Sequence, residues 1–127
     1  MQTEETTPLD WAWTQREIGD AWGALARLTH DENDVRKSTA ARQEALKVYT
    51  LDRAPRSWAQ TLHDMAVDEM DGAAPEKRME AMRRSSALYE QVLEAITPEE
   101  LPVEYALSVG NLGSARVEIG TAETDPA

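Results

Sequence analysis

The densest group of residues able to bind a metal or move a proton is His63-Asp64, followed by Asp68 and Glu69. Histidine with nearby carboxylates is a common composition for metal sites and acid–base pairs. On a helix, however, His63 does not share one face with both later acids, and no second histidine stands nearby. The other histidine, His30, lies in an acidic stretch without calcium-loop spacing. We interpret both histidines as surface residues and predict no metal and no other cofactor.

A second group with binding chemistry is a pair of basic dipeptides, Arg36-Lys37 and Arg83-Arg84, which recur 47 residues apart. On stacked helices they would form a ladder of cations able to hold a carboxylate or phosphate group. A glutamate stands four residues before Arg36 and another four residues before Arg84, the favourable order for ion pairs along a helix. The anion-binding ladder is therefore a candidate site, and ordinary surface ion pairs are the alternative.

Composition limits the classes of function. The chain has no cysteine, which excludes disulfides, thiolate catalysis and cysteine metal sites. It also has no phosphate-cradling glycine loop, no nucleophile elbow and no zinc motif, so we predict a protein that is not an enzyme. The formal charge is −11, with acidic ends and a balanced middle, and this argues against nucleic-acid partners and anionic membrane surfaces. A cytoplasmic location is the default expectation.

The elements that would position these groups follow from an internal repeat. Pro8-Leu9-Asp10-Trp11-Ala12 recurs as Pro55-Arg56-Ser57-Trp58-Ala59 and as Pro102-Val103-Glu104-Tyr105-Ala106, each copy 47 residues after the last. Seven residues after each aromatic stands an apolar residue followed by a small one, at 18–19, 65–66 and 112–113. A fixed period in this range is typical of stacked helical hairpins.

Apolar periodicity and breaker residues predict five helices and no sheet. We expect helices at about 8–28, 34–51, 55–71, 75–96 and 102–119. Thr7 is a candidate cap for the first helix, and Gly120 is expected to end the last one. The expected domain spans 8–120, with repeats at about 8–54 and 55–101 and a half repeat at 102–120. The predicted disordered tails are 1–7 and 121–127.

This pattern resembles the tetratricopeptide repeat family, in particular its longer bacterial variety. The first copy, Pro8-Leu9-Asp10-Trp11-Ala12-Trp13-Thr14-Gln15-Arg16-Glu17-Ile18-Gly19-Asp20-Ala21, carries the resemblance most closely. The resemblance implies an all-α, right-handed superhelix of antiparallel helical hairpins, in the order A1-B1-A2-B2-A3. It also implies a scaffold for protein–protein interaction, whose first helices line a concave groove.

By the same analogy, the groove would be lined by one set of residues from each first helix: Trp13, Arg16 and Asp20; Gln60, His63 and Val67; Leu107, Ser114 and Val117. Some family members hold a peptide's terminal carboxylate with a basic clamp. The corresponding positions here are Arg16, His63 and Gly110, so that clamp is not evident. Trp13 has no aromatic counterpart one repeat later and is the best candidate for an exposed binding anchor.

The sequence is compatible with three functions. The first is a non-catalytic module that binds a peptide or helical segment of another protein in the groove. The second is a homodimer formed through the last helix, which lacks a covering partner and carries Val103, Val109, Val117 and Ile119. The alternative from another class is a ligand-sensing or catalytic helical domain, with a small-molecule pocket between the hairpins.

Overall fold

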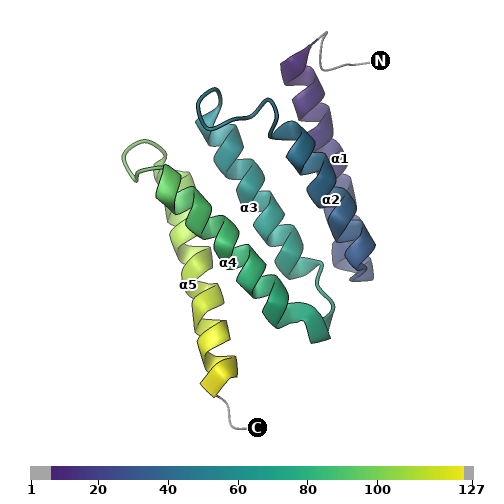
Figure 1. Ribbon diagram of the computed structural model, residues 1–127, viewed down its shortest axis with the longest axis vertical. Coiled ribbons are helices and arrows are strands. Elements are labelled where there is room, and N and C mark those ends of the chain that lie inside the picture. The colour runs from purple at the N-terminus through teal and green to yellow at the C-terminus, as the bar shows by residue number, and fades with distance from the viewer. Residues whose placement is uncertain (1–6, 125–127) are drawn as a thin grey trace.

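The computed structural model describes residues 7–124 and is all-helical over that range. The predicted class, all-α without a sheet, is confirmed for these residues. The elements are α1 (Pro8–Thr29), α2 (Glu32–Ala45), α3 (Pro55–Asp71), the short 3-10 helix η1 (Pro75–Lys77), α4 (Arg78–Ala95) and α5 (Pro102–Thr124). Figure 1 shows α1/α2 and α3/α4 side by side, with α5 alongside α4, so that α1 and α5 lie at opposite ends of the row.

The repeated prolines begin the odd-numbered helices. Pro8, Pro55 and Pro102 each occupy the first helical position, where the missing N–H costs no hydrogen bond. Three residues later the aromatic amide donates to the carbonyl just before the proline, at 2.8–2.9 Å in all three copies. Thr7 supplies this carbonyl to α1, but its hydroxyl forms no cap bond, so the predicted side-chain cap is wrong.

The repeated aromatics pack between helices. Trp11 is partly buried against a cluster that contains Ala12, Ala45 and Tyr49. Trp58 and Tyr105 are partly buried against a second cluster, formed by Ala59, Leu62, Met65, Val92, Ile96 and Leu101. Each aromatic therefore helps to join its own helix to a neighbouring one, which gives the 47-residue repeat its structural role.

Two helix boundaries differ from the sequence prediction. Helix α2 begins at Glu32 because Asp31 caps it by accepting a hydrogen bond from the Asn33 amide, at 2.8 Å. It ends at Ala45, six residues early, because the chain then turns to bury Val48 and Tyr49.

The end of α5 also differs, since this helix passes through Gly120 and ends at Thr124. Gly120 has no positive φ, so it does not act as a left-handed helix terminator. The expected tail at 121–127 is therefore wrong for its first four residues. The remainder of that tail and residues 1–6 of the N-terminal tail lie outside the described residues.

Helix α1 leaves some of its large apolar side chains partly exposed. Ile18 is 40% exposed and Leu25 is 39% exposed. The residues of α1 that are fully buried are instead the small ones: Ala12, Gly19, Gly23 and Ala26. As the first helix of the row, α1 is covered on one side, and small residues let its neighbours approach closely there.

Of the three small residues at repeat-equivalent positions, Gly19 and Ala66 are buried and Gly113 is exposed. A Cβ at position 113 would meet nothing within 4 Å. The small residue at 113 therefore does not serve a close helix approach, because no described helix follows α5. Among residues 7–124, no helix is long and apolar enough to cross a membrane.

Candidate functional site

A buried charge network joins the first three helices. The Nε of Arg42 in α2 donates to Oδ2 of Asp68 in α3 at 2.7 Å, and its Nη1 donates to Oδ1 of Asp20 in α1 at 2.9 Å. The Ser38 hydroxyl lies within hydrogen-bond reach of both the Gly19 carbonyl oxygen and the Asp68 carboxylate. Arg42 and Asp68 are 2% and 1% exposed, so this charge pair is almost completely removed from water.

The network keeps Arg42 charged despite its burial. Burial by itself lowers the pKa of the guanidinium, but the hydrogen bond and charge of Asp68 oppose it. With smaller contributions from Asp20 and Asp64, the net result is a raised pKa. Arg42 therefore stays protonated at any pH at which the fold persists, and it serves as a fixed cation beneath the surface.

Above this network opens the first of two neighbouring pockets. It lies between α1 and α3, has a volume of about 230 Å³, and we name it the α1/α3 pocket. It is lined by Asp20, Arg27, Arg42, Asp64, Val67 and Asp68. Arg16 of α1 reaches its rim and pairs with Asp64 at 3.8 Å.

A second pocket opens on the other side of α3. It has a volume of about 250 Å³, and we name it the α3/α5 pocket. It is lined by Val67, Met70, Asp71, Ser85, Tyr89, Asn111, Ser114, Ala115 and Glu118. Val67, which is half-buried, lines both pockets. The surface formed by the two pockets is called here the α1/α3/α5 face.

Tyr89 forms part of the floor of the α3/α5 pocket. Burial raises the pKa of its hydroxyl, whereas a side-chain hydrogen-bonding contact with Ser85 lowers it. The negative charges of Asp71 and Asp64 raise this pKa further. Its ring contacts that of His63, with centroids 5.8 Å apart. The phenol therefore remains neutral around pH 7 and keeps both a donor and an acceptor.

Only some of the predicted groove residues line the two pockets. Asp20, Val67 and Ser114 line the two pockets, and Arg16 pairs across α1 and α3. His63 shares a hydrogen bond of 3.1 Å with Asn111, which links α3 to α5. Trp13 is 56% exposed, Leu107 is exposed and Gln60 is half-buried, and none of the three lines either pocket. Val117 lines a separate pocket, with Met79 and Met82.

The cluster of His63, Asp64, Asp68 and Glu69 is likewise dispersed. Asp68 turns inward to Arg42, while Glu69 accepts a hydrogen bond from Arg84 at 2.9 Å. Within the described residues, no group of three or more His, Cys, Asp or Glu side chains could hold a metal ion.

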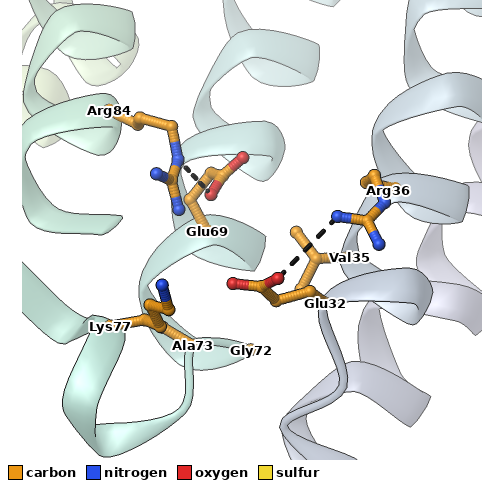
Figure 2. Close-up of a pocket in the computed structure, with 8 residues that line it drawn as sticks. All are labelled: Glu32, Val35, Arg36, Glu69, Gly72, Ala73, Lys77 and Arg84. Carbon is orange, nitrogen blue, oxygen red and sulfur yellow. Dashed lines mark hydrogen bonds and ion pairs between the residues drawn. The ribbon is translucent and has the colours of Figure 1, made fainter. Parts of the chain in front are cut away.

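The predicted basic ladder is partly assembled, in a third pocket of about 230 Å³. Figure 2 shows Arg36 and Arg84 on opposite walls of this pocket, with Lys77 below them. Arg36 pairs with Glu32 at 3.8 Å, as predicted, but Arg84 pairs with Glu69 of α3 rather than with a glutamate of its own helix.

The other two members of the ladder point elsewhere. Lys37 lies over the Trp22 ring, 4.3 Å from its centroid, and Arg83 lines a different pocket beside α5. The third pocket is thus lined by three cations and two carboxylates, and both carboxylates are already paired with an arginine. Its charge is close to balanced, and this makes it a weaker candidate than the α1/α3/α5 face.

The sequence interpretation missed Arg42 as the centre of the site. A signal was present, because Ser38 and Arg42 share helical spacing with Ala41 and Ala45 on the buried side of α2. Polar residues at such positions must find partners inside the fold. In the structure, Gly19 and Gly23 leave the space that this network occupies, since added Cβ atoms there would meet Arg42 and Asp68 at 2.9 and 2.5 Å.

Searches of protein-family models, curated proteins and solved structures find no match to this chain.

Proposed function

We propose that this protein is a non-catalytic interaction module that binds a basic peptide or helical segment of another protein on the α1/α3/α5 face. One observation carries the proposal, namely that Val67 separates two pockets that flank α3. An apolar residue between polar hollows is the arrangement in which a bound peptide makes apolar contact at its centre and polar contacts on either side.

Charge indicates the chemistry of the partner. Asp20, Asp64, Asp68, Asp71 and Glu118 line the two pockets, against only Arg27 and Arg42. The whole chain has the same sign, with a formal charge of −11. A basic segment would be attracted at long range and would meet the partly or fully exposed carboxylates of Asp20, Asp64, Asp71 and Glu118, whereas nucleic acid would be repelled. Asp68 is buried and remains paired with Arg42.

The proposal extends to the architecture. The 47-residue repeat, the prolines at the helix starts and the two side-by-side hairpins support a right-handed, tetratricopeptide-like superhelix. In that arrangement α1, α3 and α5 are the first helices of successive repeats, and the face they form is the concave one.

Selection from a random peptide library displayed on phage tests this function. We expect enrichment of peptides rich in lysine and arginine, and we expect Val67→Arg to weaken their binding at least tenfold, about 1.4 kcal/mol. A long cation at this position would block both pockets and repel the peptide. Isothermal titration calorimetry with the purified variant measures the change.

Val109→Arg is the matched control, because Val109 is exposed and lies in α5 but lines neither pocket. Its affinity should stay within about twofold of the unaltered protein, a few tenths of a kcal/mol. Enrichment of acidic or neutral peptides, or equal losses from the two variants, would contradict binding on this face.

Self-association through α5 is the second candidate, and exposed apolar surface supports it. Val117 is 69% exposed and shares an open pocket with Met79 and Met82, and Val103 is 63% exposed. Burying such a surface against a second copy would be favourable. We expect light scattering to detect a concentration-dependent dimer that Val117→Asp converts to monomer. A constant monomer mass over the concentration series would exclude this candidate.

A further inference from the structure

We propose that the α3/α5 pocket receives a lysine or arginine side chain of the partner, an inference that rests on the proposed function. Such a side chain has an aliphatic stem and a cationic end with several N–H donors. A pocket that recognises it needs apolar walls for the stem, carboxylates for the charge and further acceptors for the remaining donors.

The apolar walls come from both helices that flank the pocket. Val67 and Met70 stand on α3, and Ala115 faces them from α5. A flexible methionine adapts its shape to an incoming chain, which suits an unbranched aliphatic stem. The volume of about 250 Å³ is large enough for one such side chain but not for a folded segment.

The carboxylates are Asp71 and Glu118, one from each flanking helix. Asp71 is exposed and carries no ion pair to any described residue. Glu118 pairs with Arg78 at 3.2 Å, and both side chains are about half exposed. Exposed pairs of this kind contribute little to stability, so a partner cation can replace Arg78 at little cost.

Buried hydroxyls supply the second, independent indication of a ligand. Ser85 lines the pocket and is 0% exposed, and in the described part of the chain its Oγ makes no hydrogen bond of good geometry, only a contact with the Tyr89 hydroxyl. The neutral Tyr89 hydroxyl lies beside it. A buried hydroxyl whose hydrogen bonding is incomplete is costly, and a donor at the end of a lysine or arginine side chain would complete it after a small side-chain shift.

The α1/α3 pocket does not offer the same chemistry. Its central carboxylate, Asp68, is already satisfied by Arg42 and Ser38, and Arg42 itself occupies the floor. An incoming cation there would meet a fixed cation. The α3/α5 pocket is lined by no basic residue, and this difference assigns the basic side chain to it.

The test is a nuclear magnetic resonance titration of ¹⁵N-labelled protein with three probes: N-acetyl-arginine amide, N-acetyl-lysine amide and the neutral isostere N-acetyl-citrulline amide. We expect saturable shifts of the Asn111 and Ser114 amides with at least one cationic probe and none with citrulline. The two cationic probes distinguish an arginine pocket from a lysine pocket.

Asp71→Asn should weaken binding of the effective probe at least fivefold, whereas Asp52→Asn should leave it unchanged. Both residues are exposed, and both substitutions remove one negative charge, but Asp52 lies in the loop before α3 and outside the pocket. Equal shifts with citrulline, shifts that do not saturate, or no effect of Asp71→Asn would overturn the inference.

Failure of this inference is distinguishable from failure of the proposed function. If a selected peptide still depends on Val67 while no probe shifts Asn111 or Ser114, only the assignment of the pocket is wrong. If no basic peptide is selected at all, the proposed function fails independently of the probes.

Discussion

Replacing Arg42 with methionine is expected to lower the free energy of unfolding by about 3–5 kcal/mol, because it leaves a buried carboxylate without its main partner. Asp68 is 1% exposed and receives its closest charged hydrogen bond from Arg42, at 2.7 Å. After the substitution only the Ser38 hydroxyl and the distant Arg27, at 3.9 Å, would face it. Methionine fills the space of the stem but donates no hydrogen bond.

Urea denaturation followed by circular dichroism measures this loss. Arg36→Met is the matched control, since Arg36 lies in the same helix but its pair with Glu32 is exposed. Exposed pairs are worth about 0–1 kcal/mol, so the control should unfold at nearly the same urea concentration. Equal losses from the two variants would mean that the Arg42 network does not hold the first three helices together.

Gly23→Ala is expected to destabilise the protein by about 1–3 kcal/mol, which is the usual cost of overpacking a tight interface. The new Cβ would lie 2.5 Å from Oδ1 of Asp68 and 3.0 Å from its Cγ. Asp68 cannot move away freely, because its other oxygen is bonded to Arg42 and Ser38. Helix α1 would have to move outward and loosen the network.

Gly113→Ala provides the comparison, since its Cβ would meet nothing within 4 Å. In a helix interior, alanine is favoured over glycine by about 0.5–1 kcal/mol, so this variant should be slightly more stable than the unaltered protein. The two substitutions are chemically identical and should shift the thermal midpoint in opposite directions. A shift in the same direction for both would show that α1 does not pack closely on Asp68.

Much of the fold could be predicted because its signals are local. Pro8, Pro55 and Pro102 begin three of the helices, and the aromatic three residues after each one packs against a neighbouring helix. Such features depend on the order of neighbouring residues, which the sequence states directly. The helix starts at these prolines are confirmed for this reason.

The features that could not be predicted depend on contacts between distant residues. Arg84 pairs with Glu69 on the neighbouring helix although Glu80 stands at the favourable spacing within its own helix. Arg42 and Asp68 are 26 residues apart, and nothing local indicates that they meet. Gly120 does not end α5, because a glycine interrupts a helix only when the backbone around it changes direction.

The two pockets of the α1/α3/α5 face also contain both predicted and unpredicted residues. The resemblance to tetratricopeptide repeats predicted Asp20, Val67 and Ser114 as groove residues, and these three line the pockets. Asp71, Ser85 and Tyr89 were not expected there, because Asp71 stands at the end of its helix and the other two come from α4. Ser85 and Tyr89 line this pocket because α4 packs closely against both α3 and α5.

The most direct test of the central claim is a map of backbone amide shifts when a selected basic peptide is added to ¹⁵N-labelled protein. Binding on the α1/α3/α5 face predicts that the largest shifts cluster around Val67, with Asp20 on one side and Ser114 on the other. Shifts that cluster instead around Arg36 and Lys77 in the third pocket, or only along the outer side of α5, would contradict it.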